Sequence, residues 1–374
     1  MNFLFLASFG QVASYVGYVL LAVLLLLVMI TVHELGHYLT GKMLGFGIDE
    51  FAVGFGPKIF SKKKKDGEVF SIRALPLGGF CAFSGEDEDS KDPKAFNNRK
   101  PWQRLIVLVS GALMNYLFAL LIICVMFGAY GKNALVTYKV NDLPLGYDSQ
   151  NSFISRDVIL KANGKNVYIT SDLMSAIEGK EAGETVDFKI MRQGKVMDLT
   201  VKLREHTNFK NLEDITLLYD ALGVYYQTDE TNGEMIDGGL YATGVKLGFF
   251  RTIGASVEYS IKLAGTVFIV LGQLLTGKLG LSSMGGTVTT IAVTAQAISF
   301  GFRNLLNIGA FIGVNLAVFN LLPIPALDGS RVIFTLIEWV RGKPISRKVE
   351  GIIHTVGLVL LVLFAVFIDL QRCF

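Results

Sequence analysis

Four long, uncharged apolar stretches dominate the hydrophobic pattern of the chain. They run approximately from Val12 to Val32, from Leu105 to Tyr130, from Leu305 to Leu327 and from Gly351 to Ile368. Each is close to the roughly 20 residues that a helix needs to cross the hydrocarbon core of a bilayer. No Lys or Arg precedes the first stretch and no small-residue cleavage pattern follows it, so we expect a permanent span and not a signal peptide. The pattern predicts an α-helical membrane protein with about four transmembrane helices.

Two weaker apolar stretches lie between the second and third spans. The stretch from Leu263 to Leu275 has only 13 residues, and the stretch from Leu279 to Phe302 is rich in Ser, Thr and Gly. These features are typical of interfacial or buried segments, so we expect both stretches to lie on, or dip into, the outer face of the membrane. An odd number of extra crossings here would contradict the distribution of basic residues.

Basic residues gather in two connecting segments. The segment between the first two spans contains Lys42, Lys58, Lys62, Lys63, Lys64, Lys65, Arg73, Lys91, Lys94, Arg99, Lys100 and Arg104. The segment after the third span contains Arg331, Arg341, Lys343, Arg347 and Lys348. Because cytoplasmic loops carry an excess of Lys and Arg, we expect both segments in the cytoplasm and both chain termini outside.

Between the second and third spans the pattern changes to a period of two. Apolar and polar residues alternate from Val186 to Ile190 and from Met197 to Leu203, and Gln193-Gly194 separates these runs as in a β-hairpin. Upstream, Asn163-Gly164 ends a further strand-like run, and Ser171 is a candidate cap for a short helix through Ile177. The pattern predicts a small mixed β domain at residues 136–205, inserted between a first membrane half (1–130) and a connecting segment (206–303) with a second membrane half (304–374).

Composition and charge narrow the function classes. Of the 374 residues, 51% are hydrophobic and 18% are charged, below the roughly 25% charged residues of soluble domains. The net charge of +3 is too small to indicate a nucleic-acid partner. Cys81, Cys124 and Cys373 are scattered, so we expect neither a disulfide framework nor a cysteine zinc site.

A metal-binding pattern lies at the inner end of the first span, in His33-Glu34-Leu35-Gly36-His37. Two histidines four residues apart share one face of a helix and can bind one zinc ion, and the intervening glutamate can take a proton from water on the metal. A chance match, or a packed polar cluster at a helix end, is the alternative. Three ionisable groups beside hydrocarbon are costly, which favours the metal site.

Asp328 is the best candidate for a third ligand. It ends the third span within Asn320-Leu-Leu-Pro-Ile-Pro-Ala-Leu-Asp328-Gly329, where two prolines break the helix. The first and third spans both run inward, so Asp328 reaches the depth of the histidines although it follows His37 by 291 residues (328 − 37). An ordinary turn is the alternative. We expect His206 and His354 to be solvated or interfacial.

These motifs resemble a known family. Together with Gly54-Phe-Gly56 and Leu75-Pro-Leu-Gly-Gly79, they are similar to the site-2 protease family of intramembrane zinc metalloproteases, in particular to the bacterial regulator-of-sigma-E protease type with one PDZ-like domain. The resemblance covers nearly the whole chain. Three motifs depart from the family pattern. Gly111-Ala replaces Gly-Pro in the second span, Arg156 replaces the glycine that begins the PDZ signature, and Ser282-Ser-Met-Gly-Gly286 replaces the Ser-Gly-Pro that follows the module.

The resemblance implies a function. It implies a zinc-dependent endopeptidase of the bacterial cytoplasmic membrane that cleaves single-span proteins such as anti-sigma factors, or remnant signal peptides. It implies His33, His37 and Asp328 as ligands of one Zn²⁺, Glu34 as the catalytic residue and Asn320 as a substrate-binding residue. A catalytically silent membrane scaffold is the alternative, and a metal transporter is a weaker one because the ligands lie at one depth.

Two accessory elements complete the interpretation. Phe55 to Phe60 and Val69 to Ala74 flank Asp66-Gly67, which predicts a membrane-associated β-hairpin able to pair with an unwound substrate as an added strand. A basic loop held at anionic lipid is the alternative. We interpret the outside domain as a size filter or docking element, or else as a structural cap.

Overall fold

The computed structural model of the protein describes residues 9–86, 90–137, 152–204, 215–224, 226–228, 235–280, 284–343 and 345–371. The chain divides into two compact units. One, the membrane unit, combines Met1–Ile123 with Val257–Phe374; the other, the inserted unit, is Cys124–Ser256. We describe each unit by itself.

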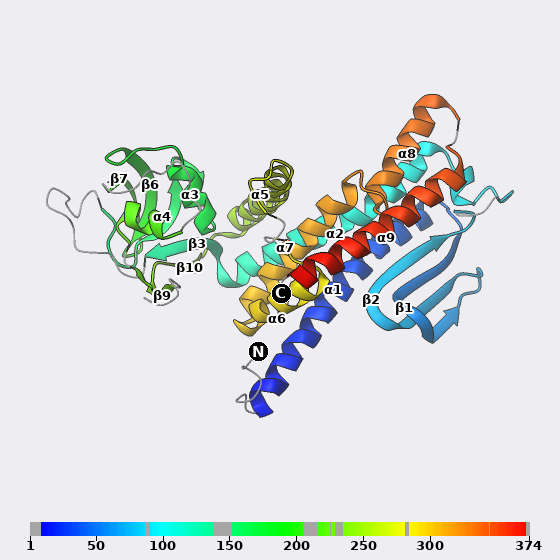
Figure 1. Cartoon of the computed structure of the whole chain (residues 1–374), viewed down its shortest axis with the longest axis horizontal. Coiled ribbons are helices and arrows are strands. Elements are labelled where there is room, and N and C mark those ends of the chain that lie inside the picture. Colours follow the sequence, from blue (N-terminus) through cyan, green and yellow to red (C-terminus); the bar gives the residue numbers. More distant parts are fainter. Residues whose placement is uncertain are drawn as a thin grey trace. The chain divides into compact units, whose positions relative to one another are not determined.

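Four helices of the membrane unit correspond to the four apolar stretches. They are α1 (Phe9–Met43), α2 (Pro101–Tyr130), α7 (Phe302–Leu321) and α9 (Arg347–Gln371), and they run in nearly the same direction or its reverse in Figure 1. Helix α7 ends six residues before the expected boundary at Leu327, because Pro323 and Pro325 cannot continue its hydrogen bonding. The protein is thus mostly helical, with several long apolar helices and additional β sheets.

Helix α5 (Phe249–Leu275) contains the stretch from Leu263 and begins 14 residues before it (263 − 249). It has 27 residues and is a fifth helix, among those described, that is long and apolar enough to cross a membrane. Charged residues interrupt its apolar pattern, which is why the sequence showed only its second half. Its sides are reversed relative to a soluble helix: Ser256 and Ser260 are buried, whereas Ile253 and Ile261 are exposed. The shorter α6 (Thr287–Ser299) follows it.

The predicted hairpin is present and longer than expected. Strand β1 (Ile48–Lys63) pairs with β2 (Val69–Phe83). Bulges fold the pair over on itself, so that Phe51 is the partner of both Cys81 and Phe70. The bend occurs at Gly54 and Gly56, whose φ angles of 87° and 82° favour glycine. Figure 1 shows the hairpin beside the C-terminal part of α1.

Buried charge fastens the hairpin to α1. The Glu68 carboxylate at the start of β2 is buried, with 2% of the side chain exposed, and forms ion pairs with Lys42 of α1 at 2.5 Å and with Lys64 at 2.7 Å. Tyr38 of α1 packs edge-on against Phe51 of β1 at a ring-centroid distance of 5.2 Å. These contacts attach the hairpin to the C-terminal part of α1.

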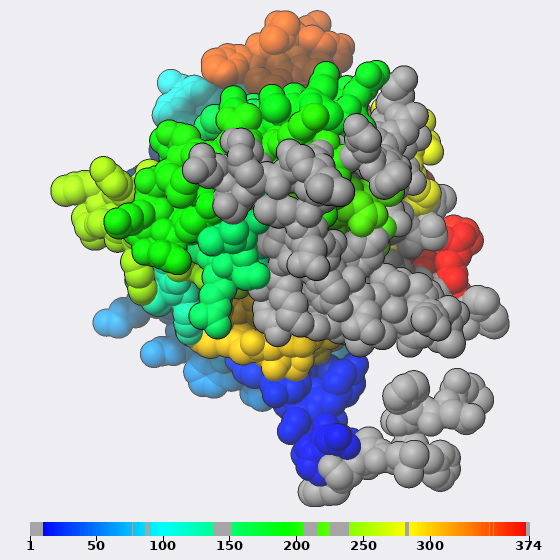
Figure 2. Space-filling view, turned by 90° about the vertical axis from the view of Figure 1, so that its left-hand side faces the viewer, coloured from blue at the N-terminus to red at the C-terminus, as the bar shows by residue number. Residues whose placement is uncertain are grey.

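The inserted unit contains an antiparallel sheet with the strand order β10-β3-β4-β6-β7 and with β5 on β4. Its elements are β3 (Lys132–Thr137), β4 (Val158–Ala162), β5 (Lys165–Asn166), α3 (Thr170–Ile177), β6 (Thr185–Arg192), β7 (Lys195–Lys202), α4 (Ile215–Leu222), β8 (Tyr226–Thr228), β9 (Met235–Gly238) and β10 (Leu240–Val245). The hairpin at Gln193-Gly194 is confirmed. Figure 2 shows the surface of this unit in green.

One detail of the inserted unit differs from the prediction. The short helix through Ile177 is present, but Asp172 and not Ser171 satisfies its N-terminus: the Asp172 carboxylate accepts the backbone N–H groups of Tyr168 at 2.7 Å and Ile169 at 3.1 Å. A carboxylate three residues into a helix can reach back in this way. The compact unit 124–256 overlaps the predicted domain 136–205 and extends beyond it, since β10 pairs with β3.

Candidate metal centre

Helix α1 presents two imidazoles to the interior of the membrane unit. His33 and His37 are separated by one helical turn and are buried, with 8% and 7% of each residue exposed. Their Nε2 atoms lie 3.1 Å apart. The helix periodicity expected from the sequence therefore brings both rings to one point.

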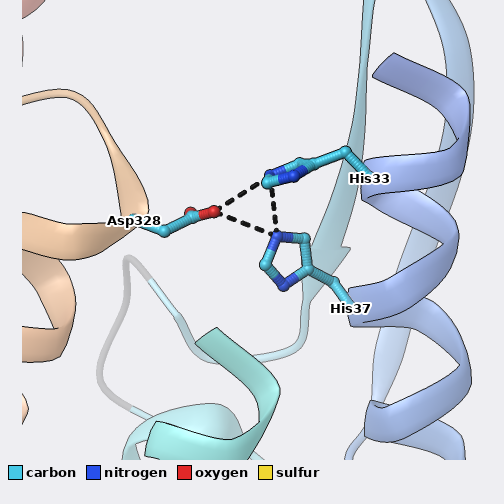
Figure 3. A group of neighbouring side chains, drawn as sticks. All are labelled: His33, His37 and Asp328. Carbon is cyan, nitrogen blue, oxygen red and sulfur yellow. Dashed lines mark hydrogen bonds and ion pairs between the residues drawn. The ribbon is translucent and has the colours of Figure 1, made fainter. Parts of the chain in front are cut away.

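Asp328 reaches the same point from a different part of the chain. It is the first residue of α8 (Asp328–Arg341) and follows the proline-containing loop that ends α7. Its Oδ2 atom lies 2.9 Å from His33 Nε2 and 3.2 Å from His37 Nε2. Figure 3 shows the three side chains converging from the two helices. The sequence prediction that these three residues meet is confirmed by their geometry.

The donor set fits a zinc ion. A tetrahedral zinc site with bonds of roughly 2.0–2.1 Å has donor atoms about 3.3 Å apart, close to the three separations of 2.9, 3.1 and 3.2 Å found here. The His37 Nδ1–H donates to the carbonyl oxygen of Val107 in α2 at 2.8 Å. Because a carbonyl only accepts, this bond leaves the Nε2 lone pair of neutral His37 directed at the centre.

Glycines allow the helices to approach closely around this centre. A Cβ at Gly111 of α2 would clash with His37 Nε2 and would lie 2.8 Å from His33 Cε1. A Cβ at Gly36 of α1 would lie 2.9 Å from the Gly111 Cα. Any larger residue at either position would force the helices apart. The sequence shows that the second span has a glycine at position 111, but it does not show that Gly111 contacts the imidazoles.

Glu34 lies beside the centre in a polar cavity. The cavity has a volume of about 290 Å³, and its lining includes Glu34, His37, Cys81 and Asp328. The backbone of β2 lies close to Glu34: a Cβ on Gly79 would lie 3.6 Å from the Glu34 Cγ. The glutamate therefore shares one cavity with two of the three candidate ligands, His37 and Asp328, within reach of the place where a proton acceptor for hydrolysis is needed.

An ion pair that the sequence did not suggest closes one side of this cavity. Arg331, one turn into α8, pairs with Glu86 after β2. Burial of the guanidinium lowers its pKa, but the surrounding carboxylates of Glu86, Asp328 and Glu350 raise the pKa of Arg331 overall. The arginine therefore stays charged. In the sequence, the only signal for Arg331 as a residue of this site is its position three residues after Asp328.

The remaining candidate residues are placed as follows. The Asn320 side-chain amide nitrogen lies 3.4 Å from His33 Nδ1, at the edge of the centre. His206 lies outside the described residues. His354 is not solvated: its side chain is 15% exposed, and its Nδ1 accepts the backbone N–H of Ala326 at 3.2 Å.

Comparison with known proteins identifies the family. The model described as peptidase family M50 matches residues 21–364. The chain belongs to peptidase family M50, the site-2 protease family. A provisionally named zinc metalloprotease of Clostridium perfringens is 32% identical over 362 residues, which cover 95% of this chain and 98% of that protein.

Two further M50 relatives span similar lengths. A provisionally named zinc metalloprotease of Clostridium acetobutylicum is 31% identical over 356 residues, covering 94% of this chain and 96% of that protein. The zinc metalloprotease RasP of Bacillus licheniformis is 27% identical over 433 residues, covering 91% and 96%. The M50 protein described here is therefore a membrane zinc metallopeptidase, and its His-His-Asp group is a candidate zinc site.

Proposed function

We propose that this M50 peptidase cleaves peptide bonds within the transmembrane segments of single-span proteins. Anti-sigma-factor-like proteins and remnant signal peptides are the substrate classes that fit. The observation that carries the proposal is the convergence of Asp328 on His33 and His37 from a distant part of the chain, in a cavity shared with Glu34. In this proposal His33, His37 and Asp328 hold one zinc ion.

The reaction follows from the residues around that site. When bound, zinc supplies Lewis-acid activation of water and polarises the scissile carbonyl. Glu34 accepts a proton from the attacking water and returns it to the leaving amine. Val107 holds the His37 ring through its Nδ1–H, and Arg331 balances the carboxylates on the cavity wall.

The hairpin provides a means of binding an unwound substrate. In the described register the Phe80–Phe83 part of β2 has strand partners on one side only, in β1. Phe80, Cys81, Ala82 and Phe83 all line the cavity that contains Glu34. An extended substrate segment can add to this edge as a further strand, which would place its carbonyl groups beside the metal centre. Asn320, on the opposite side of His33, would bind the substrate backbone.

The same convergence supports a proposal for how the helices lie in the membrane. The ends of α1 and α7 reach one centre, which supports an even number of crossings between α2 and α7. Asp369, near the end of α9, accepts the backbone N–H groups of Val288 at 2.9 Å and Thr289 at 3.1 Å, so α6 begins at the level where α9 ends. We place α5 and α6 on or within the outer face of the bilayer, with the basic loops in the cytoplasm and the termini outside a bacterial cytoplasmic membrane.

The inserted unit is extracytoplasmic and PDZ-like in this proposal, and acts as a docking element or size filter. If it is a filter, a protein lacking residues 136–205 but retaining its fold will cleave substrates with larger external domains. Unchanged size selectivity would assign the unit a structural role. The alternative function, a silent scaffold that binds partners through this unit, does not explain why Glu34 lies beside three metal ligands.

The deciding experiment is cleavage of a single-span model substrate, already trimmed on its external side, by purified detergent-solubilised protein. We expect cleavage by the wild type, none after zinc chelation, and recovery when zinc is restored. The Glu34→Gln variant should keep zinc and fold but lose cleavage. If the zinc-loaded wild type fails on several unrelated substrates, or if Glu34→Gln remains active, the proposal is wrong.

A further inference from the structure

The loop between α7 and α8 holds Asp328 in an unusual conformation. Ala326, two residues before Asp328, has a φ angle of 76°, in the left-handed region that non-glycine residues rarely adopt. Two prolines in the same loop, Pro323 and Pro325, restrict the neighbouring residues further. Such a conformation is unfavourable for an alanine and persists only where surrounding contacts impose it.

Those contacts come from α9, a helix that contributes no candidate metal ligand. The backbone N–H of Ala326 donates to His354 Nδ1 at 3.2 Å. One turn further along α9, Gly357 packs directly on the loop, because a Cβ there would lie 2.9 Å from the Pro325 carbonyl carbon and would clash with the Pro325 ring. An imidazole and a glycine thus fix two consecutive residues of the loop.

The His354 ring is itself fixed by α8. The Phe334 ring of α8 packs edge-on against it at a centroid distance of 5.9 Å and an interplanar angle of 72°. The Glu350 carboxylate lies 3.9 Å from His354 Nε2 on the other side. Since α8 begins at Asp328, the histidine contacts both the loop before the aspartate and the helix after it.

We propose that His354 and Gly357 are positioning residues for the metal centre. They act through the Pro325–Ala326 peptide to set where the Asp328 carboxylate lies relative to His33 and His37. This inference rests on Asp328 being a zinc ligand. Neither residue touches the metal or the substrate, so their contribution is to metal affinity and to the geometry of the donor set. Groups that orient a ligand from outside the coordination sphere typically contribute about 10–100-fold to metal affinity.

The test measures metal binding without relying on catalysis. Zinc affinity is determined by competition with a chromogenic chelator, and the ligand-field absorption of the Co²⁺-substituted protein reports the coordination geometry. We expect His354→Leu to weaken zinc binding by about 10-fold or more and to change the Co²⁺ spectrum. His354→Asn should restore most of the affinity, because the amide oxygen occupies nearly the position of Nδ1 and accepts the same N–H.

A glycine pair on α9 supplies a matched control. Gly357→Ala inserts a methyl group into Pro325, whereas Gly351→Ala inserts the same group where nothing lies within 4 Å. We expect weaker zinc binding only for Gly357→Ala, at unchanged helical content for both variants. This pair decides the question even if His354→Leu does not fold.

The outcomes distinguish the positioning role of His354 and Gly357 from the assignment of Asp328 as a zinc ligand. If Asp328→Ala weakens zinc binding but His354→Leu and Gly357→Ala leave the affinity and the Co²⁺ spectrum unchanged, the positioning role is wrong and the zinc site stands. If Asp328→Ala itself leaves zinc binding unchanged, the assignment of Asp328 as a ligand is wrong.

Discussion

The membrane unit and the inserted unit each contain an aspartate that faces polar partners, fully buried in the inserted unit and partly buried in the membrane unit, and the partners differ. In the inserted unit Asp157 is fully buried, and its oxygens accept Arg192 Nε at 2.9 Å and Arg192 Nη2 at 2.7 Å, so donors face acceptors. In the membrane unit Asp328 Oδ2 faces the Nε2 atoms of His33 and His37. Three electron-pair donors directed at one point repel one another unless a cation lies between them. A carboxylate of the first kind stabilises a fold, and one of the second kind is a candidate metal ligand.

The largest expected effect comes from removing the aspartate of the metal centre. Asp328→Ala deletes one of three candidate ligands, and the loss of metal-assisted hydrolysis should lower the cleavage rate by about 1,000-fold or more, which is several kcal/mol of transition-state stabilisation. The measurement is single-turnover cleavage together with zinc content after dialysis. Asp198→Ala in β7 is the control, since that side chain is 82% exposed. Retained zinc and activity in Asp328→Ala would contradict the contrast between the two aspartates.

The complementary change breaks the ion pair of the inserted unit. Arg192→Ala leaves the Asp157 carboxylate buried without its guanidinium, and the removal of one partner of a buried pair typically destabilises a protein by about 3 kcal/mol or more. We expect faster hydrogen exchange in β4 and β6, with zinc affinity unchanged. A loss of zinc affinity would show that the Asp157–Arg192 ion pair also affects the candidate zinc site at Asp328.

The sequence predicted which three side chains converge better than it predicted the helices around them. Side-chain spacing along one helix and a charge at the end of an uncharged span are local signals, and they identified His33, His37 and Asp328. Helix α5 was only half recognised, because serines lie on the buried face of its first half and Glu258 and Lys262 interrupt its apolar pattern. The packing of Gly111 on the imidazoles depends on how two distant helices cross, and no local pattern contains that information.

The helix crossing at the metal centre gives a third, smaller effect. Gly111→Ala places a methyl group against His37 Nε2 and should displace both imidazoles, which we expect to weaken zinc binding by about 10–100-fold. Gly128→Ala on the same helix is the matched control, because nothing lies within 4 Å of its added Cβ. Chelator competition measures both variants. Equal zinc affinities for the two would mean that α2 yields to the methyl group and that close helix packing is not what fixes the donor set.

The smallest expected effect concerns Glu50, a carboxylate in the membrane unit that faces hydrogen-bond donors, as Asp157 does in the inserted unit. Glu50 of β1 accepts Ser71 Oγ at 2.6 Å, Arg73 Nη2 at 2.8 Å and Lys58 Nζ at 3.0 Å. Desolvation raises its pKa, but these three donors outweigh it and lower the pKa of Glu50 to about 2. A carboxyl group whose pKa is lower in the folded state stabilises that state above the unfolded pKa of about 4.5, and this contribution is lost as the pH falls toward 2.

Hydrogen exchange of the intact protein, followed in the segments β1 and β2, measures the contribution of Glu50 to stability. Protection in β1 and β2, after correction for the intrinsic exchange rate, should stay constant from about pH 8 to pH 5 and decrease below about pH 4. Glu50→Gln should lower protection by about 1 kcal/mol at neutral pH and remove its share of the acid dependence. A variant with the wild-type profile would show that the Glu50 cluster does not hold the hairpin. The Glu68 ion pairs with Lys42 and Lys64 would then be the charged contacts that hold the hairpin to α1.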